Sequence, residues 1–243
     1  MRREDKLWDG YCLIQDDRFF KLGQDSVLLS AFAQPPTRAK VMDLGCGNGA
    51  LGVLLCARFP RISVTGLEYQ PEVAELAQEN TVRNQLDDRM TIVCGDVRDY
   101  KQYYPVGAFD YLVCNPPYFS ENSGYHAAGA HKNKARQETN GTLEQFVQAA
   151  GYLVKYGGRA AFVHRPERLC DCIALFRKYD LEPKRLRMVH QTAASAPSAV
   201  LIEVRRGSAP GIQILSPLLV NGSDGKPTEE YRTIYHQDQF IYE

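Results

Sequence analysis

Asp43 and the glycines after it are the first residues whose types and spacing suggest chemistry. An apolar run, Val41–Leu44, leads into Gly45–Gly49, and the largely apolar stretch Ala50–Ala57 follows. Glycines let the backbone bend sharply and let a ligand approach main-chain N–H groups at the start of a helix. We therefore expect a strand, a ligand-binding turn and a helix here, in the arrangement that binds nucleotides.

The kind of nucleotide depends on Asp43. Gly47–Gly52 also fits the G-x-G-x-x-G spacing of dinucleotide sites. A carboxylate just before the first glycine would repel a pyrophosphate but could orient a cationic α-amino group. S-adenosylmethionine (SAM) carries such a group, so we favour SAM over NAD, with a tight turn that binds no ligand as a third reading.

Glu68 and Asp96 end the next two strand-like runs. In a doubly wound sheet an acidic side chain at the position of Glu68 reaches the ribose hydroxyls of a nucleoside. NAD enzymes also bind ribose with an acidic residue at this position, and a solvent-exposed acidic residue at a strand end would have the same sequence pattern. Glu68 therefore supports a nucleoside ligand without choosing one. Asp96 could instead be an ordinary turn residue.

Asn115-Pro116-Pro117-Tyr118 directly follows the apolar run Phe109–Cys114 and resembles the N/D-P-P-Y/F motif of amino-methyltransferases. The exocyclic amine of adenine is a poor nucleophile because its lone pair is delocalised into the ring. The side-chain carbonyl of Asn115 and the main-chain carbonyl of Pro116 can accept its two hydrogens and aim the lone pair at a methyl donor. Tyr118, with Phe119, can stack on a flipped base. A plain Pro-Pro turn would explain neither Asn115 nor Tyr118.

The segment Ser120–Gly141 lacks hydrophobic periodicity and carries Lys132, Lys134 and Arg136. We expect a lid or substrate arm whose cations meet phosphates, with a solvated loop as the alternative. The chain has 29 Lys+Arg and 29 Asp+Glu, a formal charge of zero. A nucleic-acid surface must therefore come from local clusters, for which Arg165–Arg168 and Arg185–Arg187 are further candidates.

Alternating strand-like and helix-like segments fill most of the chain and predict a doubly wound, mostly parallel α/β sheet. We expect three parts, namely a strand and helix extension over 1–36, a core over 37–206 and a hairpin-like extension of the same domain over 207–243. Asp25 or Ser26 is expected to cap a helix over Val27–Ala33. The predicted core elements are Ile62–Leu67, Pro71–Val82, Met90–Cys94, Phe109–Cys114, Thr142–Tyr156, Arg159–His164, Pro166–Tyr179, Leu186–His190 and Ala199–Val204.

No signal peptide and no apolar run of the ~20 residues that a membrane helix needs is visible, which predicts a cytoplasmic protein without a membrane partner. The five histidines show no metal-ligand spacing such as H-E-x-x-H. We therefore expect no metal. The oligomeric state stays open.

Taken together, several stretches resemble the bacterial tRNA (adenine-N6) methyltransferases that act on adenine 37 of valine tRNA, within the class I SAM-dependent methyltransferases. The resemblance implies a Rossmann-like, seven-stranded fold, SAM as cofactor and tRNA as substrate. The stretches that carry it are Gly23–Ser26, Asp43–Gly49, Asn115–Tyr118, Ala135–Glu138 and Pro210–Leu218.

The same resemblance assigns roles to individual residues. It implies that Asp96 accepts from the adenine amine of the cofactor and that Gln24–Ser26 closes over its methionine end. The implied cofactor-binding residues are Asp25, Asp43, Gly45, Gly47, Glu68, Asp96, Val97 and Asn115. The implied catalytic residues are Asn115, Pro116 and Tyr118, and the implied substrate-binding residues are Tyr118, Phe119, Lys132, Lys134 and Arg136.

Three other functions fit parts of the pattern. Release-factor glutamine methyltransferases share N-P-P-Y, but they resemble a core preceded by a helical domain, and only about forty residues precede the glycine turn here. DNA adenine methyltransferases need extra target-recognition sequence. A binding module without catalysis would not need Asn115 and Tyr118 together.

Overall fold

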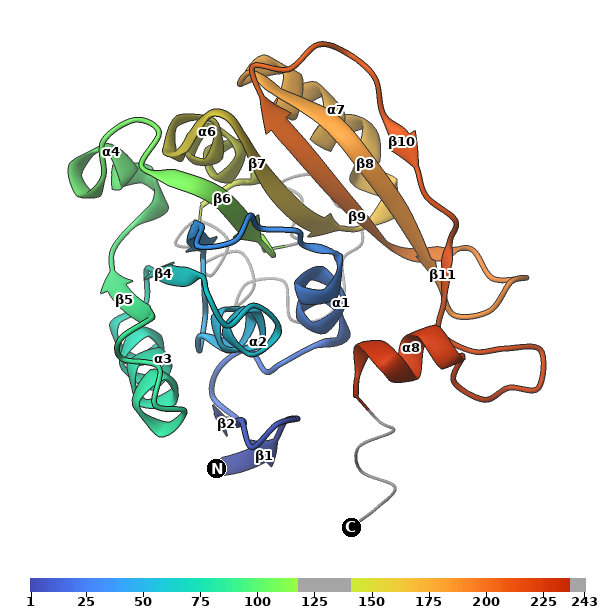
Figure 1. Cartoon of the computed structure of the whole chain (residues 1–243), viewed down its shortest axis with the longest axis horizontal. Helices are drawn as coiled ribbons and strands as arrows, with labels where there is room; N and C mark the ends of the chain where they lie inside the picture. The colour runs from blue at the N-terminus through green and yellow to red at the C-terminus, as the bar shows by residue number, and fades with distance from the viewer. Residues whose placement is uncertain (118–140, 237–243) are drawn as a thin grey trace, which may run out of the picture.

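A central sheet of nine strands organises the chain in the computed structural model, which describes residues 1–117 and 141–236 (Figure 1). The strand order is β10-β8-β9-β7-β6-β3-β4-β5, and β11 also pairs with β8. The strands are β3 (Lys40–Leu44), β4 (Ser63–Glu68), β5 (Met90–Cys94), β6 (Phe109–Cys114), β7 (Val154–His164), β8 (Leu181–His190), β9 (Pro197–Arg206), β10 (Gln213–Ile214) and β11 (Leu218–Leu219).

The direction of the strands confirms the predicted doubly wound, mostly parallel α/β sheet, but the sheet has nine strands and not the expected seven, because the two-residue strands β10 and β11 add to β8. Strands β3 to β7 pair in parallel, so their carboxyl ends meet at one edge. Strand β9 runs antiparallel to both β7 and β8. The chain order along the sheet reverses between β3 and β6, where open α/β sheets bind their ligands.

Helices cover both faces of the sheet (Figure 1). Alternate residues of a strand point to opposite faces, so Met42 and Leu44 of β3 enter one core while Val41 enters the other. The helices α6 and α7 pack on the first face, and α1 and α2 on the second. Their bounds are α1 (Gln24–Phe32), α2 (Ala50–Arg58), α3 (Pro71–Arg83), α4 (Tyr100–Tyr103), α6 (Leu143–Leu153), α7 (Leu169–Lys178) and α8 (Glu229–Ile234), with short 3₁₀ turns η1 (Val97–Asp99) and η2 (Pro166–Arg168).

The first residues of two helices show that the local sequence predicts one helix cap correctly and the other incorrectly. Thr142 and Gln145 form a reciprocal capping box at the start of α6. The cap predicted for α1 is wrong, because the helix begins at Gln24 and the extended residue Gly23 precedes it without a side-chain cap. Asp25 and Ser26 therefore lie inside the first turn of α1.

Two extensions flank the sheet. At the N-terminus, where the sequence predicts a strand and helix extension, β1 (Arg2–Lys6) and β2 (Cys12–Asp16) form an antiparallel hairpin, which lies against α3 and below α2 in Figure 1. At the other end β10 and β11 both run parallel to β8, and farther along the extension Asn221 and Pro227 form an antiparallel bridge around a turn. Pro217 lies between β10 and β11, and each strand adds separately to the sheet edge.

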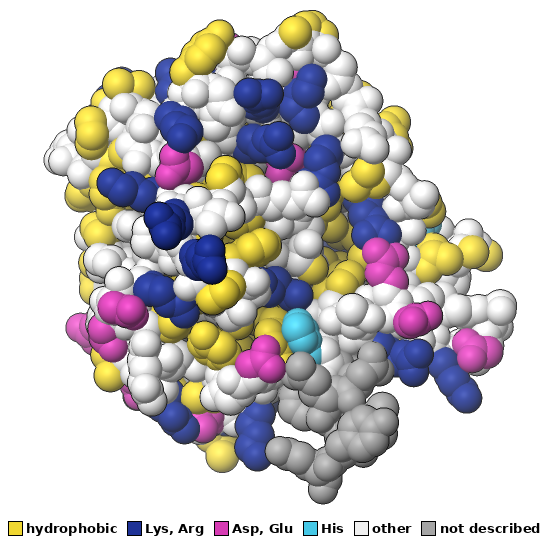
Figure 2. Space-filling view, in the orientation of Figure 1, with side chains coloured by type: hydrophobic (Ala, Val, Ile, Leu, Met, Phe, Trp, Pro, Cys, Tyr) yellow, Lys and Arg dark blue, Asp and Glu magenta, His cyan; other side chains and the backbone are white. Residues whose placement is uncertain are grey.

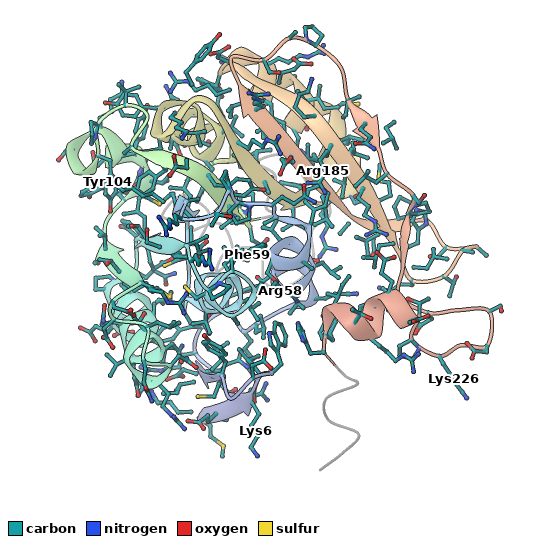
Figure 3. The ribbon with its side chains drawn as sticks, in the orientation of Figure 1. Lys6, Arg58, Phe59, Tyr104, Arg185 and Lys226 are labelled. Atoms are coloured by element: carbon teal, nitrogen blue, oxygen red, sulfur yellow. The ribbon has the colours of Figure 1, made fainter. Side chains whose placement is uncertain are left out.

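Basic side chains are unevenly distributed over the surface despite the zero net charge. Figure 2 shows many Lys and Arg side chains over the upper part of one face, where β7, β8 and β9 lie. Arg185, labelled in Figure 3, belongs to this region. Among the described residues no helix combines the length and the apolar composition needed to cross a bilayer.

Candidate active site

A pocket lies at the carboxyl ends of the central strands. Four of the predicted site residues line it, namely Asp43, Gly45, Gly47 and Asn115. Its remaining lining is Phe20, Lys21, Leu22, Ser26, Cys46, Asn48, Ala50 and Leu51. The structure therefore brings the glycine turn and the Asn-Pro-Pro segment to one site, although they are far apart in the sequence.

The glycine turn requires glycine at its bends. Gly45, Gly47 and Gly49 have φ values of 76°, 55° and 79°, a left-handed conformation that other residues rarely adopt. A Cβ on Gly45 would also lie 2.9 Å from the ring of Phe146. Above Gly47 nothing lies within 4 Å of such a Cβ. The turn therefore presents its backbone to open space there, as close approach of a ligand requires.

Asp43 supplies a carboxylate at the base of the pocket. Its side chain is 1% exposed, and its Oδ2 has no hydrogen-bond partner among the residues that the structure describes. The pKa of Asp43 is raised to about 7, mainly by burial and also by the nearby charge of Glu68, against a hydrogen bond from the main chain of Gly52 that lowers it. A buried carboxylate oxygen without a partner is costly, so a cationic group of a ligand would stabilise it. This arrangement fits the amino group of SAM.

Glu68 holds the turn from the tip of β4. Its carboxylate accepts from the N–H of Gly47 at 3.0 Å and from the N–H of Gln70 at 2.9 Å. The side chain is buried, and burial raises the pKa of Glu68 although both main-chain donors oppose this effect. A carboxylate accepts more than two hydrogen bonds, so Glu68 keeps acceptor capacity for ribose hydroxyls while it fixes Gly47.

Asn115 follows β6 and faces the first helix. Its Nδ2 donates to the hydroxyl of Ser26 in α1 at 3.2 Å. Because the two polar atoms of an amide point in different directions, this bond sets which way the carbonyl oxygen of Asn115 is turned. Pro116 behind it is buried. The acceptor that the chemistry of an adenine amine needs is thus held on a rigid segment.

Asp96 is engaged by a neighbour in the structure. Its carboxylate accepts from the N–H of Arg98 at 2.8 Å and forms an ion pair with the guanidinium of Arg98. This hydrogen bonding to Arg98 lowers the pKa of Asp96. An adenine amine would have to share the carboxylate with Arg98. The side chain of Val97 is buried in the core on the α6 face, so only its main chain is available to a cofactor.

The N-terminal segment forms a wall of the pocket that the sequence did not suggest. Phe20, Lys21 and Leu22 lie between the hairpin and α1, and Phe20 is 73% exposed. The N–H of Leu22 donates to the side chain of Gln15 at 2.7 Å. Gln15 belongs to β2, so the hairpin holds this wall. In the sequence, the aromatic pair Phe19-Phe20 just before the helix was the only local signal.

Other predicted residues lie away from the pocket or outside the described residues. Asp25 is not among the lining residues, whereas its neighbour Ser26 is. Arg185 and Arg187 are bound within the fold, to Glu203 and to Glu230 respectively, so they form no free cluster. Tyr118, Phe119, Lys132, Lys134 and Arg136 fall outside the described residues, as does the predicted arm from Ser120 to Asn140.

Comparison with known proteins identifies the kind of enzyme. The family model described as "Methyltransferase small domain" matches residues 23–171. The tRNA1(Val) (adenine(37)-N6)-methyltransferase of Porphyromonas gingivalis is 32% identical over 191 residues, which cover 76% of this chain and 74% of that protein. The same-named protein of Dickeya chrysanthemi is 27% identical and covers 88% of this chain and 85% of its own.

Solved structures show the same fold. A predicted O-methyltransferase of Agrobacterium tumefaciens superposes with a TM-score of 0.72 at 20% identity, covering 88% of this chain and 96% of that one. The family match and the curated relatives support a SAM-dependent enzyme over an NAD protein or a binding module without catalysis. The chain is a SAM-dependent methyltransferase and belongs to the methyltransferase small-domain family, together with the tRNA1(Val) (adenine(37)-N6)-methyltransferases.

Proposed function

We propose that this protein methylates N6 of adenine 37 in tRNA1(Val) with SAM as the methyl donor. One observation carries the proposal: Asn115 lines the same pocket as Asp43 and the glycine turn, with its amide nitrogen bound by Ser26. The names of the relatives supply the nucleoside and the tRNA. A tRNA substrate also supports a cytoplasmic location. We further propose that residues 37–206 form the methyltransferase core, with extensions at 1–36 and 207–243.

Residues in and beside the pocket bind different parts of the cofactor. Asp43 stabilises the cationic amino group of the cofactor, and the glycine turn lets its main chain approach the ligand. Glu68 accepts hydrogen bonds from the ribose hydroxyls. Asp96 accepts a hydrogen bond from the adenine amine of the cofactor, and the main chain of Val97 contacts the adenine. When bound, SAM supplies a methyl group on a positively charged sulfur.

Asn115 and Pro116 prepare the nucleophile. The Oδ1 of Asn115 and the main-chain oxygen of Pro116 accept the two hydrogens of the adenine amine, so the nitrogen lone pair leaves the ring and becomes available for attack. Tyr118 and Phe119 stack on the flipped base, and Lys132, Lys134 and Arg136 bind phosphates. The methylated nitrogen is acidic and releases its proton to water, so no side chain needs to act as a base.

Methylation of defined acceptors tests this function. The purified protein should methylate a tRNA1(Val) transcript with adenine at position 37, and it should leave the same transcript with guanine at 37 unlabelled. Nucleoside mass spectrometry should identify the product as N6-methyladenosine. Labelling of a release factor or of duplex DNA, with none of the tRNA, would contradict the proposal and favour the glutamine or DNA adenine methyltransferases.

A further inference from the structure

Asn80, in α3, joins the glycine turn to the N-terminal hairpin. Its side chain is 0% exposed and makes three hydrogen bonds to main-chain groups. The Nδ2 donates to the carbonyl of Asn48 at 2.9 Å and to the carbonyl of Ile14 at 3.0 Å. The Oδ1 accepts from the N–H of Ile14 at 2.7 Å. Both amide hydrogens are therefore used, one on the turn and one on β2.

Asn84 lies one helical turn later and makes a similar set of bonds with one difference. Its Oδ1 accepts from the N–H of Cys12 at 2.9 Å, and its Nδ2 donates to the carbonyl of Cys12 at 2.8 Å. Its other amide hydrogen goes to the carbonyl of Asn80 within α3, at 2.7 Å. Both asparagines thus pair with β2 as a neighbouring strand would, but of these two side chains only Asn80 reaches the glycine turn.

The carbonyl held by Asn80 lies at the centre of the turn. Asn48 stands between Gly47 and Gly49, two residues with left-handed backbone. Glycine loses more conformational freedom on ordering than any other residue, so such a turn is costly to fix. On its other side Glu68 binds the N–H of Gly47. Two side chains, from β4 and from the helix after it, therefore bind main-chain groups of the turn, one at Gly47 and one at Asn48.

Helix α3 also supports the turn by close packing. Ala77 precedes Asn80 by three residues and is equally buried, so the two lie on one face of the helix. A Cβ on Gly49 would lie 3.2 Å from the Cβ of Ala77. The face formed by Ala77 and Asn80 thus fits directly against the turn, and a loss of the Asn80 bond would leave a buried carbonyl of Asn48 without this donor.

We propose that Asn80 is a positioning residue for cofactor binding. It fixes the carbonyl of Asn48 and, through Ile14, links the hairpin to the turn, so that the turn is already shaped before the ligand arrives. Pre-organisation of this kind strengthens binding because less ordering remains to be done in the complex. The proposal rests on the proposed cofactor site at the glycine turn.

Comparing Asn80→Ala with Asn84→Ala distinguishes support of the glycine turn from attachment of the hairpin to α3. Each variant loses hydrogen bonds to β2, so both should unfold at a lower temperature. The hairpin keeps other contacts in both, including the ion pairs of Arg83 with Glu4 and of Arg2 with Glu79. Calorimetric titration with S-adenosylhomocysteine should show affinity about tenfold weaker for Asn80→Ala, as the loss of one buried hydrogen bond allows. Asn84→Ala should bind within about twofold of the wild type.

A kinetic assay and a second variant test whether Asn80 acts on cofactor binding. In steady-state assays Asn80→Ala should raise KM for SAM and leave kcat at saturating SAM near the wild-type value. Asn80→Ser, which keeps a small polar group, repeats the titration if Asn80→Ala is not fully folded at the assay temperature. Equal weakening in the Asn80 and Asn84 variants, or unchanged affinity in the Asn80 variants, would overturn the role of Asn80. Wild-type protein that does not bind S-adenosylhomocysteine would instead contradict the cofactor site itself.

Discussion

The amide nitrogen of Asn115 donates to the hydroxyl of Ser26 at 3.2 Å, across 89 positions of sequence. One residue follows a central strand and the other lies in the first turn of α1. The bond connects the segment that should activate the substrate to the helix that borders the cofactor pocket. Ser26, which the sequence suggested as a helix cap, therefore orients the amide of Asn115.

Asn115→Ala should abolish most turnover and leave cofactor binding intact. The variant loses an acceptor that acts on the reacting nitrogen, while Asp43 and Glu68 still hold the cofactor. Removal of one pre-organised hydrogen-bonding group typically lowers kcat about 100-fold or more. Single-turnover rates with saturating SAM measure this, and calorimetry with S-adenosylhomocysteine measures binding. A near-normal transfer rate would mean that Asn115–Pro117 is only a rigid turn.

Two variants serve as controls for Asn115. Asn115→Asp keeps acceptor oxygens at the same place and should retain more activity than Asn115→Ala. Ser26→Ala keeps Asn115 but removes the hydroxyl that orients it, so kcat should fall by a smaller factor, about tenfold, as for loss of one ordinary hydrogen bond. If Ser26→Ala matched Asn115→Ala, Ser26 would have a role of its own in transfer.

The sequence predicted the elements of the site better than their contacts. The turn after Asp43 and the Asn-Pro-Pro segment were visible because glycine and proline impose local geometry. The bonds of Ser26, Asn80 and Gln15 were not visible, because each joins segments that only the folded chain brings together. Asn80 in particular lies in the middle of an amphipathic helix, where a polar residue usually indicates an exposed position.

The edges of the fold were the least predictable part. The strands Met90–Cys94 and Phe109–Cys114 have the predicted bounds, since both are largely apolar, although only the second is buried along most of its length because β5 lies at the edge of the sheet. Strands β10 and β11 have two residues each, too few for any periodicity, and their parallel pairing with β8 depends on the tertiary path of the chain. In the same extension Asn221 and Pro227 form an antiparallel bridge across the turn between them, where Gly222 and Gly225 mark a turn in the sequence.

Glu68→Ala should weaken cofactor binding through two losses. The ribose hydroxyls would lose a charged acceptor, and the N–H of Gly47 would lose the bond that fixes the turn. Hydrogen bonds to charged groups contribute about 1.5–3 kcal/mol, so affinity for S-adenosylhomocysteine should fall about 10- to 100-fold. Glu68→Gln keeps one acceptor oxygen and should lose less. Unchanged affinity of Glu68→Ala in calorimetry would rule out the ribose role.

Glu203 should be important for stability and not for catalysis. It is 1% exposed, accepts from the hydroxyl of Tyr111 at 2.7 Å, and pairs with Arg159 and Arg185 at 3.4 Å each. Glu203→Ala would leave these partners uncompensated and should lower the free energy of unfolding by about 2–4 kcal/mol. Tyr111→Phe removes one hydrogen bond and should cost about 1 kcal/mol. Urea denaturation measures both, and a stable Glu203→Ala protein would show that the network is dispensable.

Arg168 should contribute to tRNA binding through phosphate contact. It follows β7, whose carboxyl end meets that of β6 beside Asn115. Binding of tRNA should weaken steeply with salt, and Arg168→Gln should reduce the slope of log affinity against log salt by about 1. Arg168 uses its Nε on Asp171 at 2.5 Å, but none of the described residues binds its two amino groups. Arg187→Gln is the control, because both amino groups of Arg187 already bind Glu230, at 2.7 and 2.8 Å. Equal slopes for wild type and Arg168→Gln would exclude that contact.

Asp43 should make cofactor affinity depend on pH. Burial raises its pKa from 3.8 to about 7, so below pH 7 the cofactor-free protein carries a protonated carboxyl at the base of the pocket. The cationic amino group of the ligand favours the ionised form, and binding below pH 7 must therefore release a proton. Affinity for S-adenosylhomocysteine should rise as pH increases from about 6 to 7 and level off above the folded-state pKa.

The same shift has the opposite consequence for stability. Between the unfolded-state pKa of 3.8 and the folded-state pKa of about 7, the folded protein binds more protons at Asp43 than the unfolded chain does. The contribution of this group to folding stability is therefore greatest below the unfolded-state value and is lost as pH rises to about 7. The proton that Asp43 releases when the ligand binds can be measured by calorimetric titration with S-adenosylhomocysteine at pH 6 in two buffers of different ionisation enthalpy. Asp43→Asn should abolish this proton release. Proton release that persists in Asp43→Asn would assign the titration to another group.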